Sequence, residues 1–230
     1  RIELDNKLVL YVVEDHSYPT VEVTGYIRGG QRQETKKIAG ISEFMFEMMN
    51  TGTQNYNQQE LAKYKELHGI DFGFSVKKDY YQFSGSALSS DQTELLSLIA
   101  DILQQPNFEA NYYQRIKQET KRNLAQAQTR QSSLLDMYFE KNIYQNHPYS
   151  FANNFALRLK DLVNITPQRL HDFHQQNIVP NNLVLGVVGD VDAEKIEKLV
   201  KEKFGEWSEG QVKMRKPQLQ MDTAPQGQII

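Results

Sequence analysis

Two adjacent stretches decide the fold: VEVTGYI at residues 21–27 and IAGISEFMFEMM at residues 38–49. The first alternates apolar and polar side chains, which is typical of a strand with one buried face. The second is apolar at helical spacing on nearly every side, so we expect a buried helix. The polar residues 31–36 between them are expected to form an exposed loop. A half-buried strand followed by a buried helix predicts helices packed on a sheet.

Outward from this pair, strands and helices are mixed without a regular alternation. The pattern predicts an α+β fold, a mixed and largely antiparallel sheet with helices packed on one face. The apolar run 183–188 is expected to be a fully buried strand, and residues 70–75 with 80–87 a hairpin. The remaining predictions are two strands within 2–14, and helices over 57–67, from a cap at 89–91 to 103, over 108–130, 131–144, 167–177 and 193–204.

The chain is expected to form one domain over residues 1–210. Residues 211–230 are polar and contain proline, which is typical of a linker, here toward a following domain that the chain does not include. The chain also begins at Arg1 without an initiator methionine. We therefore expect it to be a piece of a longer protein.

Composition excludes several classes of function. With 26 Lys and Arg against 29 Asp and Glu, the net charge is -3, which argues against a nucleic-acid partner because phosphates require a cationic face. No apolar stretch approaches the length of a membrane span, so no membrane partner is expected. The absence of cysteine excludes disulfides, thiol nucleophiles and cysteine-ligated metals. The compartment stays open, and it includes a periplasmic or other extracytoplasmic bacterial location.

A series of short segments resembles the pitrilysin/insulinase family of zinc peptidases, of the mitochondrial processing peptidase type. The resemblance covers essentially the whole chain, and it lies in the order and spacing of the segments together. It implies a half-domain of a family that builds active molecules from two or four related domains around a closed chamber. The segments are LDN (4–6), LYVVEDH (10–16), GG (29–30), AGISEF (39–44), MMNTGT (48–53), HPY (147–149), PNN (180–182), VVGDV (187–191) and FGEW (204–207).

The metal motif of that family is missing. Active members carry His-x-x-Glu-His on the helix after the Ala-Gly pair, where two imidazoles bind zinc and the Glu acts as general base. Here Glu43 and Glu47 stand at the histidine positions and Phe46 at the position of the catalytic Glu. A later Glu ligand of the family maps onto Asn123, or onto Glu119 one turn earlier. The chain thus has no catalytic or metal residues by this pattern.

The resemblance therefore implies a non-catalytic domain or subunit, because Phe46 cannot abstract a proton. Such a domain would form part of a peptide-binding chamber and pair with a related catalytic domain, which would hold the zinc and act on a peptide substrate. This chain would hold no cofactor and be inactive on its own, and its peptide-binding residues are unknown. Two alternatives stay open: a purely structural assembly subunit, and a divergent active metallopeptidase that uses Glu43 and Glu47.

Other candidate sites have plainer interpretations. Glu43 and Glu47 share a helix face and could bind a metal, but a solvated or ion-paired role is favoured. His171 and His174 could bind zinc, but two surface histidines are favoured, and His147 is expected to pack in a turn. No nucleophile elbow or phosphate loop is present. An aromatic cluster is expected to be core in preference to a peptide-binding wall: Phe72, Phe74, Tyr80, Tyr81 and Phe83.

Overall fold

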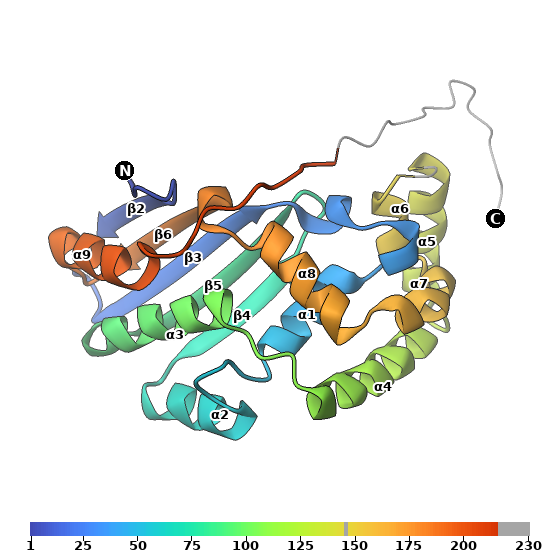
Figure 1. Cartoon of the computed structure of the whole chain (residues 1–230), viewed down its shortest axis with the longest axis horizontal. Coiled ribbons are helices and arrows are strands. Elements are labelled where there is room, and N and C mark those ends of the chain that lie inside the picture. Colours follow the sequence, from blue (N-terminus) through green and yellow to red (C-terminus); the bar gives the residue numbers. More distant parts are fainter. Residues whose placement is uncertain (145–146, 216–230) are drawn as a thin grey trace.

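A six-stranded mixed sheet forms the base of the computed structural model, which describes residues 1–144 and 147–215 (Figure 1). The strands lie in the order β1-β2-β6-β3-β5-β4. β2 and β6 pair in parallel, and the other pairings of the described strands are antiparallel. The predicted fold class is therefore confirmed. The bounds are β1 Ile2–Glu3, β2 Val9–Glu14, β3 Thr20–Arg28, β4 Asp71–Val76, β5 Tyr80–Leu88 and β6 Leu183–Gly189.

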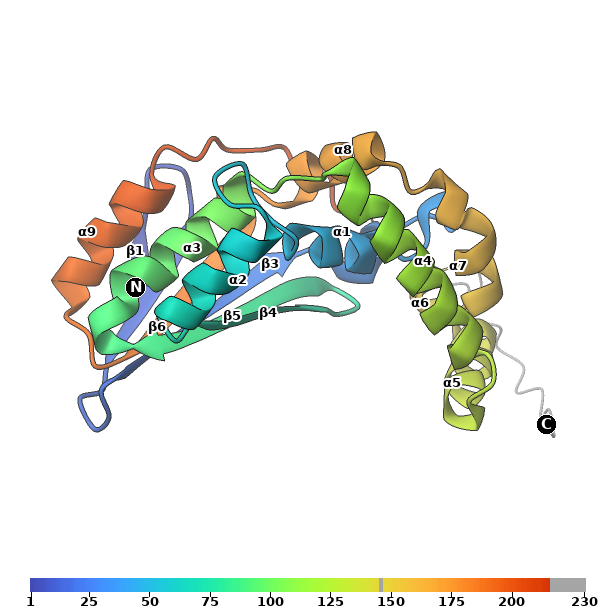
Figure 2. The same ribbon diagram turned by 90° about the horizontal axis from the view of Figure 1, so that it is seen from below.

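Helices cover one face of this sheet. Figure 2 shows α1, α2, α3 and α9 on the same side of the strands, with α4 to α7 beyond one end of the sheet. No helix of the described ranges lies on the other face. The bounds are α1 Ile41–Met49, α2 Gln58–Leu67, α3 Gln92–Gln104, α4 Ala110–Ala127, α5 Gln131–Ile143, α6 Tyr149–Ala152, α7 Phe155–Asp161, α8 Pro167–Asn177 and α9 Ala193–Phe204. Short 3-10 turns occur at Gly30–Gln33, Lys36–Ile38, Ser89–Asp91, Leu162–Asn164 and Pro180–Asn182.

The core lies between the sheet and the helices. Alternate residues of β3 are buried, with Val23 paired to Gly85 on one side and to Val187 on the other. Gly25 leaves room for the Phe83 ring, because a Cβ at this position would come within 2.0 Å of it. This packing confirms the predicted strand, and α1 contributes four buried side chains to the same core: Phe44, Met45, Met48 and Met49.

The strand at residues 183–188 differs from the prediction. It forms most of β6, but its side chains alternate, and Val184 and Val188 are exposed. A fully buried strand needs cover on both faces, and here only one face carries helices. The run of apolar residues therefore places a hydrophobic strip on the uncovered face.

Local signals predicted the starts of α2 and α8 correctly, whereas the helix predicted from residue 38 begins at Ile41 and the predicted cap at 89–91 makes no capping hydrogen bond from its side chain. The Asn57 side chain accepts hydrogen bonds from the backbone N–H groups of Gln59 and Glu60, and Glu60 completes the capping box. Thr166 caps α8, with Pro167 in the first turn. None of the helices in the described ranges is both long and apolar enough to cross a membrane.

Residues 31–36 do not form the expected exposed loop. They include a 3-10 turn, and the Glu34 side chain is buried, with 1% exposure. Its carboxylate accepts hydrogen bonds from the backbone N–H groups of Gly40 (2.6 Å) and Ser42 (3.3 Å). Gly40 precedes α1 with φ 84 and has no side chain to cap the helix. The carboxylate of Glu34 therefore caps the N-terminus of α1 in place of an N-cap side chain.

Candidate functional site

Four of the residues that the sequence assigns to the family motif line one groove between α1 and α4. Glu43 and Glu47 lie on successive turns of α1, and Glu119 and Asn123 lie on α4. The groove has a volume of about 360 Å³. Both candidates for the later ligand position line it, so the geometry is compatible with either. Its apolar walls come from Phe44, Ile116, Leu124, Ala127 and Phe155.

Phe46 does not line this groove. It points into the core with 3% exposure, where its ring stacks on Phe74 of β4 at 4.4 Å between centroids. It also packs edge-on against Tyr81, at 5.2 Å. Phe46, which the sequence assigns to the general-base position, therefore contributes to the packing between α1 and the sheet.

A guanidinium group neutralises one end of the groove. Arg158 of α7 donates from Nη2 to Glu43 Oε2 at 2.6 Å and from Nη1 to the carbonyl of Ala152 at 2.8 Å. Burial raises the pKa of the nearby Glu34 to about 7, and the positive charge of Arg158 partly opposes this rise. Arg158 thus stabilises two carboxylates, one in the core and one in the groove.

Glu47 and Glu119 are the other two carboxylates of the groove. Among the described residues, no ion pair involves Glu47 or Glu119. Desolvation raises the pKa of Glu47, and the charges of Glu119 and Glu43 raise it further. The groove is therefore acidic, with a mixed polar and apolar lining.

The histidine predictions hold in part. His147 is buried in its turn as expected, where its Nδ1 accepts a hydrogen bond from the Tyr149 backbone N–H at 3.3 Å. Burial lowers the pKa of His147. His174, expected at the surface, is buried instead with 6% exposure, and its Nε2 lies 2.9 Å from the Leu103 carbonyl oxygen. Its pKa falls to about 4 through burial. His174 therefore holds α8 against the end of α3.

The aromatic cluster divides between the two faces of the hairpin. Phe72, Tyr81 and Phe83 are buried, which confirms the core interpretation for these three. Tyr80 lies on the uncovered face beside Tyr26, with their ring centroids 5.6 Å apart. This face therefore carries aromatic surface that the core does not require.

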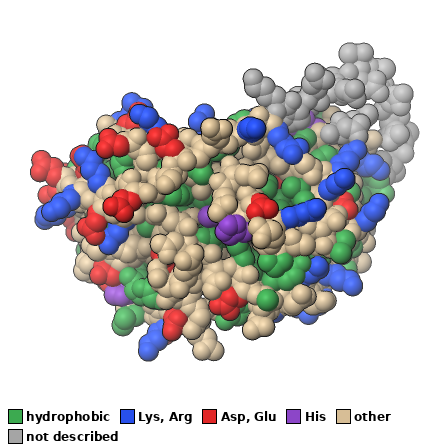
Figure 3. Space-filling view, in the orientation of Figure 1, with side chains coloured by type: hydrophobic (Ala, Val, Ile, Leu, Met, Phe, Trp, Pro, Cys, Tyr) green, Lys and Arg blue, Asp and Glu red, His purple; other side chains and the backbone are tan. Residues whose placement is uncertain are grey.

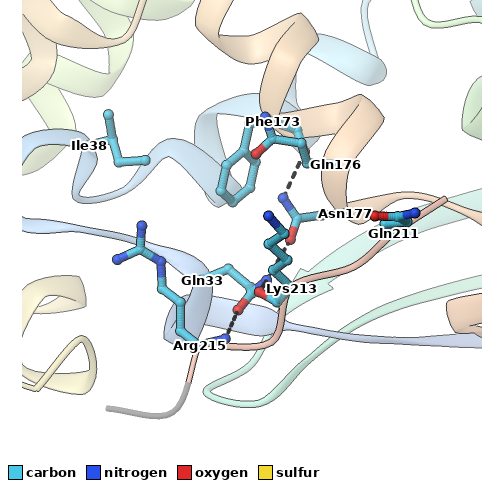
Figure 4. A pocket seen from close by; sticks show the side chains of 8 residues that line it. All are labelled: Gln33, Ile38, Phe173, Gln176, Asn177, Gln211, Lys213 and Arg215. Carbon is cyan, nitrogen blue, oxygen red and sulfur yellow. Dashed lines mark hydrogen bonds between the residues drawn. The ribbon is translucent and has the colours of Figure 1, made fainter.

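A second cavity lies beside residues 211–215, and no sequence pattern predicted it. Figure 4 shows the Gln33 side chain between α8 and the backbone of residues 213–215. Its amide nitrogen donates to the Asn177 side chain (3.0 Å) and to the Lys213 carbonyl (3.2 Å), and its oxygen accepts from the Arg215 N–H (3.0 Å). Asn181 exchanges two hydrogen bonds with the backbone of Gly210. Side-chain amides thus hold the start of the expected linker, and residues 216–230 lie outside the described part.

Sequence comparisons agree with the fold. Residues 9–152 match the family model of insulinase (peptidase family M16). The chain belongs to this family. Residues 164–230 match the model of the peptidase M16 inactive domain. Two solved structures share the fold: a peptidase M16 inactive domain from Pseudomonas fluorescens (TM-score 0.84, 22% identity, 94% of this chain and 53% of that one) and a protease from Helicobacter pylori (TM-score 0.86, 20% identity, 96% and 53%).

The chain also resembles curated proteins with different names. The probable zinc protease PqqL of Escherichia coli is 26% identical over 87% of this chain and 22% of that protein. Mitochondrial-processing peptidase subunit beta of Bos taurus is 23% identical over 84% and 39%. Cytochrome b-c1 complex subunit 1 of Rattus norvegicus is 23% identical over 90% and 42%. The chain spans half or less of the length of these relatives.

The donor set of the groove does not fit the catalytic zinc of an M16 peptidase. The two positions that the sequence assigns to imidazoles carry carboxylates, and one of them, Glu43, is already paired with the cationic Arg158. A zinc ion next to Glu43 would meet a like charge at short range. The position for the general base is an apolar side chain in the core. No hydrolytic step can therefore be assigned to these residues.

Proposed function

We propose that this chain is a non-catalytic, peptide-binding domain of an M16 peptidase. It would form part of the wall of a chamber and act beside a related catalytic domain that holds the zinc. The observation that carries this proposal is the burial of Phe46 against Phe74 and Tyr81. The helix that activates water in an active domain serves here as a packing element, while the surrounding fold is retained.

The free edge of β4 supports peptide binding. β4 pairs with β5 on one side and ends the sheet on the other. The Lys77 N–H bonds to the Tyr80 carbonyl, and the alternation of an antiparallel ladder then turns the backbone groups of Phe72, Phe74 and Val76 outward. An extended peptide can add to such an edge through main-chain hydrogen bonds. Side-chain sequence would then contribute little to affinity.

The uncovered face of the sheet supports a role in a larger assembly. Its apolar residues cluster on β2, β6 and β3, where an isolated domain would leave them in water. In a chamber this surface would face the peptide or the opposite domain. The same surface favours the second candidate function, a purely structural subunit. The residues are Tyr11, Val13, Tyr26, Val184 and Val188.

The domain arrangement is part of the proposal. Residues 1–210 would form the domain, and residues 211–230 would lead to a following domain. The hydrogen bonds of Asn181 with Gly210, and of Gln33 with the 213–215 backbone, support a fixed exit direction. The catalytic partner would follow on the same polypeptide or occupy a second subunit.

Fluorescence anisotropy with a labelled, unstructured peptide tests the binding function. Val76→Pro removes one outward N–H of the β4 edge, and Val76→Ala is the matched control that keeps it. We expect the chain and Val76→Ala to bind the peptide, and Val76→Pro to bind at least about tenfold more weakly, the equivalent of about 1.4 kcal/mol. Absence of peptide binding by the wild-type chain, combined with a stable complex with an M16 catalytic domain, would favour the structural subunit instead.

A further inference from the structure

Three metal-binding side chains meet where α2 ends and α3 begins. His68 is the C-cap residue of α2, Asp91 directly precedes α3, and Glu94 lies in the first turn of α3. One ligand atom from each residue lies within 4.8 Å of the other two. We propose that His68, Asp91 and Glu94 form a divalent metal site that takes a first-row ion such as Zn²⁺, with water as the fourth ligand.

The geometry requires only small movements. Zinc bonds to nitrogen and oxygen are about 2.0–2.2 Å long, so ligand atoms of a tetrahedral site lie about 3.4 Å apart. His68 Nδ1 and Asp91 Oδ1 are 2.7 Å apart and would open slightly as the ion replaces the proton between them. Side-chain rotation of Glu94 would close the remaining separation. All three residues are partly buried, so one face of the ion would stay open to water.

The chemistry of the donors favours a transition ion. One imidazole with two carboxylates suits zinc or manganese better than magnesium, which keeps most of its waters. Two carboxylates would balance the charge of the ion. The Ser90 hydroxyl donates to Asp91 Oδ2 at 2.7 Å, and the Tyr64 ring packs on His68 at 4.7 Å. These contacts orient two of the ligands.

Glu94 distinguishes this cluster from a simple ion pair. His16 and Asp190 form a comparable pair at 2.6 Å on the surface, and no described residue offers a third ligand there. In contrast, Glu94 joins the cluster although it makes no hydrogen bond or ion pair with any residue in the described part of the chain. An ion pair explains His68 and Asp91, whereas a metal explains all three.

The location gives the site a mechanical consequence. His68 is followed by Gly69, with φ 57, and then by the residues that open β4. A bound ion would tie this turn to the start of α3. It would therefore stiffen the entry to the edge strand, which makes the site a structural clip outside the groove of the family motif.

Isothermal titration of Zn²⁺ into the chelator-treated chain tests the proposal. We expect one equivalent to bind, and the affinity to fall more than about 100-fold in His68→Gln and in Glu94→Gln, since even outer-shell partners are worth roughly 10–100-fold. His16→Gln is the matched control and should bind like the wild type. Magnesium should not compete.

Thermal melting separates a metal site from an ion pair. Glu94→Gln should melt like the wild type without metal, yet lose the rise in Tm that Zn²⁺ gives the wild type. Two results would overturn the proposal: no zinc binding by the wild-type chain, or stoichiometric binding that His68→Gln and Glu94→Gln leave unchanged. If Glu47→Gln alone abolished binding, the metal would belong to the α1/α4 groove.

Discussion

The groove between α1 and α4 and the junction of α2 with α3 both gather ionisable side chains, but their donors differ. The groove holds four of the positions assigned to the family's metal motif, and its lining in the described part of the chain includes carboxylates and a guanidinium group but no imidazole. The junction lies outside the motif and offers an imidazole with two carboxylates. Whether a metal can bind therefore depends on the side chains that are present, and not on the location of the site in the fold.

The largest effect should come from restoring the family's general base. Phe46→Glu places an unpaired carboxylate among aromatic rings, so we expect a loss of about 3–5 kcal/mol in the free energy of unfolding. Phe46→Leu keeps an apolar side chain and should cost only about 1–2 kcal/mol. Urea denaturation measures both. A stable Phe46→Glu variant with peptidase activity would contradict the distinction between the groove and the junction, because the groove would then support metal chemistry.

Two buried titratable groups should give opposite pH dependences. Glu34 has an ordinary pKa of 4.5, raised to about 7 by burial, so its contribution to stability is fully present below pH 4.5 and is lost as the pH rises through 7. His174 has an ordinary pKa of 6.5, lowered to about 4, so its contribution is present above pH 6.5 and is lost as the pH falls through 4. Each difference corresponds to about 3 kcal/mol.

Because the two windows overlap, their slopes should largely cancel in the wild type. Relative to the wild type, His174→Gln should become less stable as the pH rises from 4.5 to 6.5, and Glu34→Gln should become more stable. Free energies of unfolding in urea at several pH values measure this. Parallel curves for the two variants and the wild type would show that neither group titrates as described.

Removing the cation of the groove should have an intermediate effect. Arg158→Met leaves Glu43 unpaired and removes a positive charge from the vicinity of buried Glu34, so we expect a loss of about 2–3 kcal/mol. Glu43→Gln should cost less than about 1 kcal/mol, because the Glu43 side chain is 44% exposed. Equal losses in the two variants would mean that Arg158 acts through Glu43 alone.

The smallest effect should come from the cap of α2. Asn57→Ala removes the acceptor for two backbone N–H groups and should cost about 1 kcal/mol. This substitution perturbs α2, which ends at His68, and leaves the lining of the α1/α4 groove unchanged. Chemical denaturation checks the loss, and an unchanged stability would show that Asn57 contributes little to the start of α2.

The sequence predicted features that depend on residues close together in the chain. Asn57 with Glu60, and Thr166 with Pro167, are local signals, and both helices begin where expected. The i, i+4 spacing of Glu43 and Glu47 also predicted that they share one helix face, and both line the same groove.

Burial of polar groups through long-range contacts escaped prediction. Arg158 and Glu43 are 115 positions apart, and His174 meets the Leu103 carbonyl 71 positions away. The sequence pattern of β6 likewise cannot show that one face of the sheet stays uncovered. Figure 3 shows acidic and basic side chains mixed over α9 on the helix-covered side. Composition gives the number of charged residues but not their location on the surface.

The most direct test of the non-catalytic assignment is mass spectrometry of an unstructured peptide incubated with the chain and Zn²⁺. The account predicts that the peptide binds and stays intact, equally with the wild type and with Glu47→Gln. Cleavage products that disappear in Glu47→Gln would contradict it, because they would place an active metal in the α1/α4 groove.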